Sequence, residues 1–464
     1  MKWFRKFFAH PEVWVLTVAA LLTRLWHLSV PSDIVFDEIY FRQFAADYLS
    51  GNYFFDVHPP FVKLLFAAVG ALFGLIPAQV ASGAAGAEVL RILPALAGAA
   101  LVPLVYIIIR QFGLGRRSAV LGAVLVLCDN ALLVESRFVL MDSLLLLFGL
   151  CALSCFLQLR KSTGTQRRVW VVAAAAFLGM LISTKWTGLA IAGLVGLVWV
   201  FEDVLNKHKL NWRRLISEMT IVFTIVSSVY IGSFVAHFSL LTHSGNGDAF
   251  MSEQFQSTLI DSPYYKPDAN MSFWDKFIEL NTAMYTAQNS LTNATHPYAS
   301  RWYSWPLEVR PIYYWAGPVL SDSRQGNIYL LGNPLVWWLS TLGVVSALIL
   351  WFVRPKWFGK RRKLATFLLV GYLFNFLPFV FIERPMFLYH YLFALLFSIL
   401  ITCVMTTILF DWLGSKYGGK LSHQLHWLLL VIIVLSFLYF LPLSYGWPLS
   451  GGDLQQHMWL QTWR

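Results

Sequence analysis

Two adjacent carboxylates, Asp37 and Glu38, lie between apolar residues shortly after the first long apolar stretch of the chain. Partial desolvation raises the pKa of a carboxyl group, and such a carboxylate suits a general base that takes a proton from a hydroxyl. Aspartate is also a common helix N-cap, so Asp37 could instead start a helix over 38–50. Taken alone, the pair favours the helix start and leaves the general base as the alternative.

A cation follows at the start of the next helical pattern. Pro59 and Pro60 can begin a helix directly after His58, which places Lys63 near its N-terminus. Free N–H groups at a helix N-terminus, together with a lysine, suit a phosphate group. Alternatively, the helix lies at the membrane interface and the lysine only reaches toward water. The spacing leaves both interpretations open.

A short polar turn over 135–142 joins two apolar stretches and carries three charged residues, Glu135, Arg137 and Asp142. A guanidinium group binds oxyanions through a bidentate fork, so Arg137 could hold a phosphate. Arg137 could equally pair with Glu135 or Asp142 and hold two helices together. The spacing again does not decide between these two interpretations.

Two more cations, Lys185 and Arg384, lie at the ends of later apolar stretches. Ionisable groups at such positions are costly near hydrocarbon unless they serve a function. Together with Lys63 and Arg137, they place four cations near two or three carboxylates at one membrane face. This pattern predicts an anionic, membrane-embedded ligand. A channel would instead carry polar residues at mid-membrane, which this chain mostly lacks.

The elements that must position these residues are membrane-spanning helices. The chain has 464 residues, of which 58% are hydrophobic and 13% are charged, whereas soluble domains carry roughly 25% charged residues. Apolar runs long enough to cross a bilayer recur along the whole sequence. This composition excludes a soluble enzyme, a disordered chain and a collagen-like fibre. The net charge of +11 indicates basic cytoplasmic loops rather than nucleic-acid binding.

The charges of the loops predict an all-α polytopic protein with eleven spans and the N-terminus inside. If the segment 61–77 spanned the membrane, the basic loops that follow it would fall outside. An amphipathic helix along the outer surface instead puts the basic loops on one side, as the positive-inside rule requires. We therefore predict spans at 13–30, 91–109, 118–134, 138–159, 169–183, 187–201, 215–236, 334–353, 364–382, 387–410 and 425–442.

These spans divide the chain into three parts. We predict an N-terminal catalytic transmembrane module (1–236) with a first outer loop (31–90), a large outer loop (237–333) and a C-terminal transmembrane module (334–464). Basic residues before the first span are followed by no small-residue cleavage pattern, so a cleavable signal peptide is not expected. All four cysteines lie in apolar runs, without disulfide or metal-ligand spacing: Cys128, Cys151, Cys155 and Cys403.

Five segments, in order along the chain, resemble the protein O-mannosyltransferase family. Residues 36–38 and 55–63 are similar to its first luminal loop, and 137–142 is similar to its Arg-x-x-Leu-Leu-Asp turn. The sequence Lys-Trp-Thr-Gly-Leu from Lys185 resembles its Lys-x-x-Gly-Leu element. Two segments, 296–307 and 384–391, complete the match. The large outer loop is too short for the β-trefoil module of eukaryotic members, so the chain resembles the compact bacterial type.

The resemblance implies a type C glycosyltransferase fold, a polyprenyl-phosphate-mannose donor and a Ser or Thr hydroxyl of a translocated protein as acceptor. It implies inverting chemistry that needs no metal or other cofactor. Asp37 would be the catalytic base, Glu38 would help to bind or orient the acceptor, and Arg137 would hold the donor phosphate. The implied site is extracytoplasmic, in the plasma membrane, with the Sec translocon as a candidate partner and no nucleic acid.

Further residues complete the predicted site. The leaving group is already anionic, so cations can stabilise it without a general acid, as a carboxylate takes the proton of the attacking hydroxyl. Lys63, Arg384 and His390 are the additional candidates for this phosphate-binding role. The remaining predicted site residues, for the acceptor or for positioning, are His58, Asp142, Lys185 and Tyr389.

Two other functions remain open from the sequence. One keeps the fold and the lipid-phosphate donor but transfers the sugar to a lipid or an envelope glycan. The segments 296–307 and 387–391 favour a protein acceptor over this alternative. The other function is transport of a lipid-linked sugar, which predicts inverted repeats and helices broken at mid-membrane. Neither feature is evident in the sequence.

Overall fold

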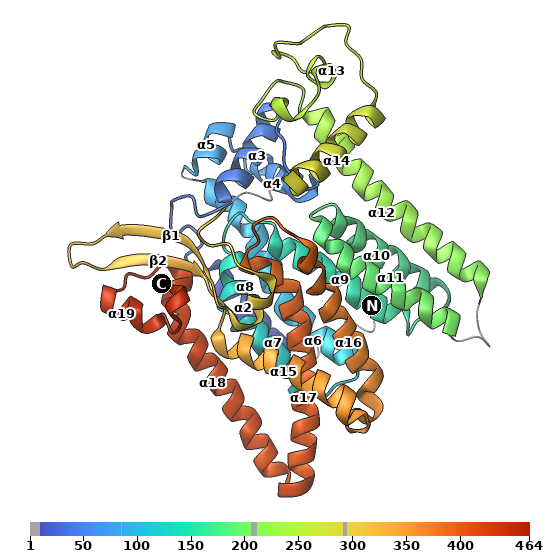
Figure 1. Ribbon diagram of the computed structural model, residues 1–464, viewed down its shortest axis with the longest axis vertical. Helices are drawn as coiled ribbons and strands as arrows, with labels where there is room; N and C mark the ends of the chain where they lie inside the picture. Colours follow the sequence, from blue (N-terminus) through green and yellow to red (C-terminus); the bar gives the residue numbers. More distant parts are fainter. Residues whose placement is uncertain (1–9, 85, 206–210, 291–294) are drawn as a thin grey trace.

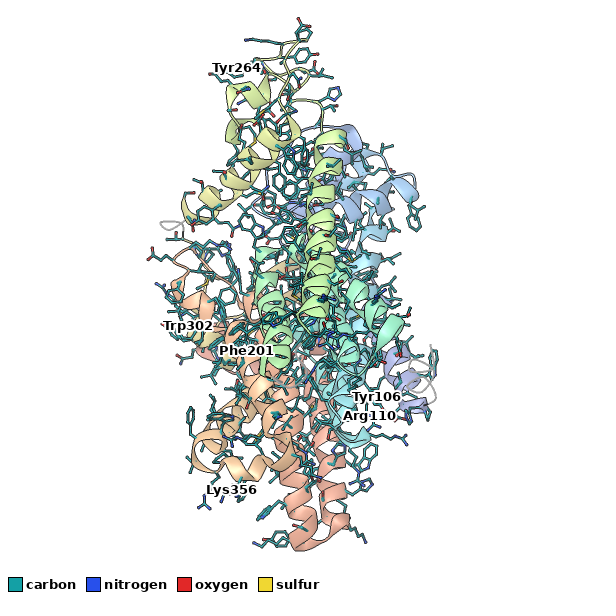
Figure 2. The ribbon with its side chains drawn as sticks, turned by 90° about the vertical axis from the view of Figure 1, so that its right-hand side faces the viewer. Tyr106, Arg110, Phe201, Tyr264, Trp302 and Lys356 are labelled. Carbon is teal, nitrogen blue, oxygen red and sulfur yellow. The ribbon has the colours of Figure 1, made fainter. Side chains whose placement is uncertain are left out.

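The computed structural model describes residues 10–84, 86–205, 211–290 and 295–464. Long helices form an elongated body, short helices gather at one end of it, and a β-hairpin lies at its side (Figure 1). Tyr264 of the large outer loop and Lys356 of a basic loop lie toward opposite ends of the long axis (Figure 2). The basic residues predicted before the first span lie outside the described residues, as does Lys207.

Within the described ranges, eight helical segments are long and apolar enough to cross a membrane. A polytopic, mostly helical fold is therefore confirmed. The eight segments contain α6 (Ile92–Gln111), α9 (Asp142–Leu159), α10 (Gly164–Ile182), α12 (Trp212–Leu240), α15 (Pro334–Val353), α16 (Arg362–Phe374), α17 (Leu392–Tyr417) and α18 (Gly419–Tyr445).

Shorter helices occupy the other three predicted spans: α2 (Pro11–Leu25), α7 (Arg116–Leu127) and α11 (Leu189–Leu205). At 1.5 Å per residue, the 15-residue helix α2 is only about 22 Å long, below the roughly 30 Å of a hydrocarbon core. The count of eleven spans therefore stays a prediction.

The span predicted at 118–134 is wrong as a single helix. Helix α7 stops, and a second short helix, α8 (Asn130–Glu135), follows it. Asp129 between them is fully buried and accepts hydrogen bonds from the N–H of Leu132 and from Nε1 of Trp337, both at 2.8 Å. The carboxylate of Asp129 thus caps α8 and interrupts the apolar run.

Helix α4 (Phe61–Leu72) is the segment that the charge argument keeps out of the membrane. Its 12 residues extend about 18 Å, too short to cross a bilayer. It packs against α3 (Glu38–Ser50), and Arg42 of α3 donates to the carbonyl of Ala87, beyond the far end of α4, at 3.2 Å. Both ends of α4 therefore lie near α3, which supports a position of α4 along the outer membrane surface. This position remains a prediction.

The described part of the large outer loop contains structure that the all-α expectation omits. It holds helices α13 (Glu253–Gln256) and α14 (Phe273–Ser290), followed by an antiparallel hairpin of β1 (Ile312–Val319) and β2 (Gln325–Leu330). The hairpin is tied to the body of the molecule, because Tyr314 donates to Glu135 at 2.8 Å and Trp315 donates to Asp33 at 2.9 Å. The short helices α5 (Pro77–Ser82) and α19 (Gly451–His457) complete this end.

Candidate active site

A cavity of about 850 Å³ combines a polar end with long apolar walls. Its walls come from four helices, α9, α11, α16 and α17, and include Leu145, Leu146, Leu189, Ala190, Gly193, Val370, Leu373, Phe374, Leu392 and Phe393. Its polar end is lined by residues of five separate segments: His58, Asp142, Lys185, Gln288, Arg384, Tyr389 and His390. The sequence predicted all of these polar residues except Gln288. The cavity has the form expected for a lipid with a charged headgroup.

Arg384 is the cation of this cavity that has no protein partner. Among the described residues, no hydrogen bond or ion pair engages its half-buried guanidinium group. Burial lowers the pKa of Arg384, because a partly desolvated charge is unfavourable without a counter-ion. The arrangement is therefore suited to an anion that enters the cavity.

Lys185 is held in a fixed position at the same polar end. Its Nζ lies 2.5 Å from Oδ2 of Asp142, the first residue of α9, and 5.3 Å from the ring centroid of Tyr389. It follows α10 directly, so the pair joins the start of α9 to the end of α10. Because Asp142 already neutralises it, Lys185 contributes less net charge to a ligand than Arg384 does.

Two histidines flank Arg384 along the cavity wall. His390 Nδ1 lies 3.0 Å from the carbonyl oxygen of Phe387, which leaves its other ring nitrogen without a partner among the described residues. Its ring stacks on Tyr389 at 4.6 Å between centroids. Burial, followed by the charges of Lys185 and other cations, holds the pKa of His58 well below its usual value. His58 is therefore neutral at physiological pH.

Asp37 occupies the N-cap position of α3, so the helix start predicted at this residue is confirmed. Its side chain accepts no cap hydrogen bond, so the carboxylate itself does not stabilise the start of the helix. Desolvation raises the pKa of Asp37 to about 6; the charge of Lys185 opposes this rise, and those of Asp142 and Asp56 add to it. Asp37 does not line the cavity itself, but it lies within electrostatic reach of the polar end.

Glu38 is adjacent to Asp37 but has a different environment. Its side chain is 0% exposed, and Arg91 pairs with both oxygens, with Nε at 2.8 Å and Nη2 at 2.6 Å. The backbone N–H groups of Val35 and Val139 donate to the same carboxylate at 3.0 and 2.8 Å. These four bonds leave no face for an acceptor, so the predicted acceptor contact is not supported and Glu38 fixes the start of α3 instead.

Arg137 does not lie in the cavity, and neither sequence interpretation describes its contacts. It is 1% exposed and donates to main-chain carbonyls at the end of α2, including those of Trp26 at 2.7 Å and His27 at 2.9 Å. Its guanidinium lies 4.3 Å from the ring centroid of Tyr445. Arg137 therefore neutralises a helix C-terminus, where carbonyl groups lack partners. A donor-phosphate role is not supported by this geometry.

Lys63 also has internal partners. It is 2% exposed, forms an ion pair with Asp56 and donates to the carbonyl of His58 at 2.6 Å. The phenyl rings of Phe44 and Phe54 enclose it, with centroids 5.3 and 5.7 Å from Nζ. Lys63 thus shapes the loop that carries His58, and its predicted contact with a donor phosphate is not supported.

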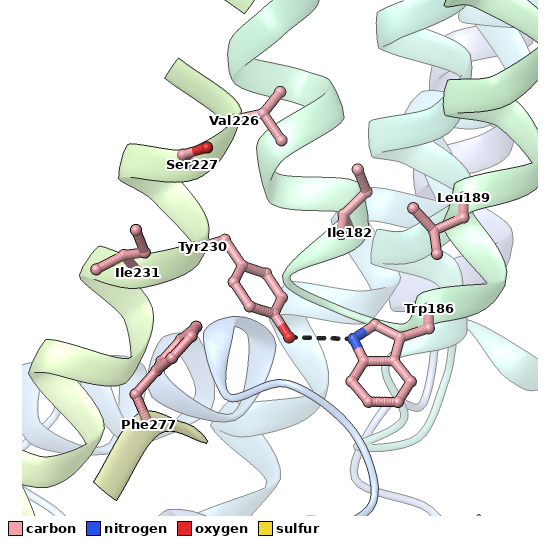
Figure 3. A pocket seen from close by; sticks show the side chains of 8 residues that line it. All are labelled: Ile182, Trp186, Leu189, Val226, Ser227, Tyr230, Ile231 and Phe277. Atoms are coloured by element: carbon pink, nitrogen blue, oxygen red, sulfur yellow. Dashed lines mark hydrogen bonds between the residues drawn. The ribbon is translucent and has the colours of Figure 1, made fainter. Parts of the chain in front are cut away.

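A smaller apolar recess of about 360 Å³ adjoins the cavity, and Trp186 and Leu189 line both (Figure 3). Trp186 Nε1 donates to the hydroxyl of Tyr230 on α12 at 3.1 Å, and this hydroxyl donates to Asn281 of α14 at 2.6 Å. No motif in the sequence indicates this connection. It links the cavity wall to the large outer loop, whose Gln288 also lines the cavity.

The fold is that of the type C glycosyltransferases, as the motifs predicted. The chain is similar to the Saccharomyces cerevisiae protein O-mannosyltransferase Pmt1-Pmt2 complex bound to the sugar donor, with a TM-score of 0.87, 20% identity and coverage of 98% of this chain and 92% of that chain. It is also similar to the apo oligosaccharyltransferase of Archaeoglobus fulgidus, with a TM-score of 0.53, 13% identity and coverage of 96% and 56%.

The chain belongs to the protein O-mannosyltransferase family. Residues 14–242 match the family model for dolichyl-phosphate-mannose-protein mannosyltransferase, and residues 273–463 match the model for the C-terminal four-TMM region of protein-O-mannosyltransferase. Dolichyl-phosphate-mannose–protein mannosyltransferase 4 of Schizosaccharomyces pombe is 30% identical over 348 residues, which cover 70% of this chain and 42% of that protein. The chain spans less than half the length of the first curated relatives that it matches.

Proposed function

We propose that this protein transfers mannose from a polyprenyl-phosphate-mannose donor to Ser and Thr hydroxyls of translocated proteins. The observation that carries the proposal is the cavity in which Arg384, a cation without a partner among the described residues, lies at the polar end of a long apolar wall. Family membership supports mannose as the sugar and protein as the acceptor.

In this proposal, the donor lies along the cavity with its phosphate at the polar end. Arg384 binds the phosphate as its counter-ion, and His390 contributes the ring nitrogen that has no protein partner. Lys185, oriented by Asp142, adds positive potential. The polyprenyl chain occupies the walls formed by α11 and α16, where burial of apolar surface stabilises it.

Asp37 acts as the general base. The acceptor oxygen forms a bond to the anomeric carbon on the face opposite the phosphate, the bond from this carbon to the phosphate oxygen breaks, and the configuration inverts. The hydroxyl proton moves to the carboxylate of Asp37, and the leaving polyprenyl phosphate keeps the electron pair beside Arg384. Glu38 holds the start of α3 through Arg91, and so positions Asp37.

No metal ion has a role in this proposal. Within the described ranges, no three His, Cys, Asp or Glu side chains group to hold one. The site belongs to the extracytoplasmic face of the plasma membrane, where polypeptides emerge from the Sec translocon. Helices α3, α4 and α14 lie at the end of the molecule that the charge argument places outside (Figure 1). Asp37 and His58 precede α3 and α4, and Gln288 belongs to α14.

The direct test is transfer of radiolabelled mannose by the purified protein from synthetic polyprenyl-phosphate-mannose to a Ser/Thr-rich peptide and, separately, to a lipid extract. We expect label on the peptide, loss of label with Asp37→Asn, and full transfer with Asp322→Asn, a matched change in the exposed turn of the hairpin. Label confined to the lipid fraction would replace the protein acceptor by a lipid. Full activity of Asp37→Asn would remove it as the base.

A further inference from the structure

Tyr314 of strand β1 is the extra residue of a β-bulge. Tyr313 pairs with Tyr329 of β2. Trp315 pairs with Ile328, the residue next to Tyr329, so one residue of β1 lies between these two pairs as an insertion. In a regular strand, consecutive side chains point to opposite faces of the sheet. Here Tyr314 and Trp315 both contact the segment before α3, because a bulge redirects side chains.

Phe36, the contact of Tyr314 in that segment, directly precedes Asp37 and has a left-handed backbone with φ of 50°. Residues other than glycine rarely adopt this conformation, because the Cβ atom crowds the backbone, so the surrounding structure must hold it. The ring of Phe36 stacks on the ring of Tyr314, with centroids 4.3 Å apart and an interplanar angle of 9°. The stack therefore holds the turn that leads into Asp37.

The other contacts of Tyr314 fix its own position. Its hydroxyl donates to Oε2 of Glu135 at 2.8 Å, and both side chains are buried. The ring of Phe138 meets the ring of Tyr314 edge-on, with centroids 6.5 Å apart. Burial, followed by the charge of Glu135, raises the pKa of Tyr314 well above its usual value, so its hydroxyl keeps the proton for this bond.

These partners of Tyr314 belong to the polar turn over 135–142, and this turn leads to the cavity. Asp142 begins α9 at the end of the turn, where it pairs with Lys185 at the polar end of the cavity. Tyr314 thus contacts the segment that carries Asp37 on one side and the segment that borders the cavity on the other. One side chain of the large outer loop therefore joins the candidate base to the candidate donor site.

We propose that Tyr314 is a positioning residue that sets the place of the Asp37 carboxylate relative to the cavity. It acts through Phe36 and does not touch the donor or the acceptor. This inference rests on the proposed function, in which Asp37 must reach the attacking hydroxyl while the donor phosphate lies in the cavity. A displacement of about 1 Å between reacting groups can lower a rate about 100-fold. A contact that only tied the hairpin to the body would instead leave the kcat of the folded protein unchanged.

The test is steady-state transfer of radiolabelled mannose from synthetic polyprenyl-phosphate-mannose to a Ser/Thr-rich peptide by purified full-length variants. In Tyr314→Leu, which removes the ring stack and the hydroxyl, we expect kcat to fall about 10- to 100-fold. The donor KM should stay within about twofold of the parent value, because the residues that line the cavity are unchanged. The control is Tyr313→Leu, since the Tyr313 hydroxyl donates to Asn327 within the hairpin at 2.5 Å, and its kcat should match that of the parent.

Two further variants test the path through Phe36 and guard against a folding defect. Tyr314→Phe keeps the ring stack, so it should lose kcat by only about 2- to 10-fold, the effect of one hydrogen bond. The double variant Phe36→Leu/Tyr314→Leu should have a kcat no lower than that of the more severe single variant, because both changes act on the same contact. Melting temperatures above the assay temperature establish that the variants are folded. If Tyr314→Leu melts below it, Tyr314→Phe alone decides.

Several results would overturn the inference. Parent kcat in folded Tyr314→Leu or Tyr314→Phe would remove the positioning role, and a raised donor KM at parent kcat would make Tyr314 a binding residue. An equal loss in Tyr313→Leu would indicate a general disturbance of the hairpin. Multiplicative losses in the double variant would exclude the path through Phe36. Absence of transfer by the parent protein would refute the proposed function and this inference with it, whereas loss confined to Asp37→Asn would refute this inference alone.

Discussion

At the scale of residues, the contrast between Asp37 and Glu38 shows how two neighbouring carboxylates acquire different chemistry. Glu38 receives four short hydrogen bonds, two from Arg91 and two from the main chain, and is closed to solvent. Asp37 has no cap hydrogen bond and remains partly open. The first arrangement fixes a helix, and the second leaves a basic carboxylate near the cations of the cavity.

The rate of mannose transfer should depend on pH through the ionisation of the Asp37 carboxyl group. Its carboxylate must be ionised to accept a proton, so kcat/KM should rise with pH through an apparent pKa of about 6. Lys185 lowers the pKa of Asp37, so Lys185→Met should move this acidic limb to higher pH, in addition to lowering the rate. Lys356→Met, at the opposite end, should leave the limb in place. Profiles of kcat/KM against pH measure both effects, and an unshifted limb in Lys185→Met would contradict the assignment.

Substitutions of Arg384 and of Arg137 should affect different properties. Arg384→Gln should weaken donor binding, whereas Arg137→Gln should lower the stability of the fold. Loss of a buried charge contact to a ligand costs about 2–5 kcal/mol, so Arg384→Gln should raise the donor KM by about 30-fold or more and leave the melting temperature near that of the parent. Arg137→Gln leaves buried carbonyls of α2 without donors, which should lower the free energy of unfolding by about 2–3 kcal/mol with little change in donor KM. The reverse pattern would restore Arg137 as the phosphate ligand.

The sequence could identify the charged residues of the site but could not tell which of them face the cavity. The structure brings His58, Asp142, Lys185, Arg384 and His390 together there. A cation close to apolar residues has the same local pattern whether it lines a cavity, as Arg384 does, or contacts main-chain carbonyls, as Arg137 does. Only contacts between segments far apart in the sequence make this distinction.

At the scale of elements, close helix contacts depend on residues without side chains. A Cβ atom at Gly343 of α15 would lie 2.2 Å from Oγ1 and 3.1 Å from Cα of Thr402 on α17, so a methyl group there must push the helices apart. A Cβ at Gly196 of α11 would meet nothing within 4 Å. An added methyl group therefore fits at Gly196 but not at Gly343.

We expect Gly343→Ala to lower the free energy of unfolding by about 1–3 kcal/mol, since overpacking a buried contact forces the backbone to shift. Gly196→Ala should be neutral or stabilise by up to about 1 kcal/mol, because alanine favours the helix. Thermal unfolding of the purified variants, followed by circular dichroism, gives the comparison. Equal effects would mean that α15 and α17 do not approach as closely as described.

The long apolar helices could be predicted from the sequence, whereas the hairpin and the break between α7 and α8 could not. Long apolar runs identify helices because the bilayer fixes their length. The hairpin segments are short, and their Tyr, Trp and Ile content is typical of strands but also of interfacial loops. Asp129 resembles one more isolated charge in an apolar run, and its capping role becomes visible only with Trp337 beside it.

At the scale of the whole molecule, the two ends of α9 mark the predicted axis across the membrane. Asp142 and Arg384 line the cavity where α9 begins, and the basic residues Arg160 and Lys161 follow directly where α9 ends. Tyr264 and Lys356 mark the same polarity in Figure 2. The distribution of charge therefore predicts the orientation of the protein, and the proposed function places the donor phosphate at the outer face.

This orientation depends on α4 remaining outside the bilayer, and cysteine labelling can test it. Ser32 precedes α4 and Asp322 follows it in the hairpin turn, and Trp315 in the first strand of this hairpin donates to Asp33, the residue after Ser32, at 2.9 Å. In a variant without the four native cysteines, Ser32→Cys and Asp322→Cys should therefore both react with a membrane-impermeant maleimide in intact cells. Lys420→Cys should react only after permeabilisation. If α4 crossed the membrane, Ser32→Cys and Asp322→Cys would label from opposite sides, and the basic loops that follow α4 would then face outward.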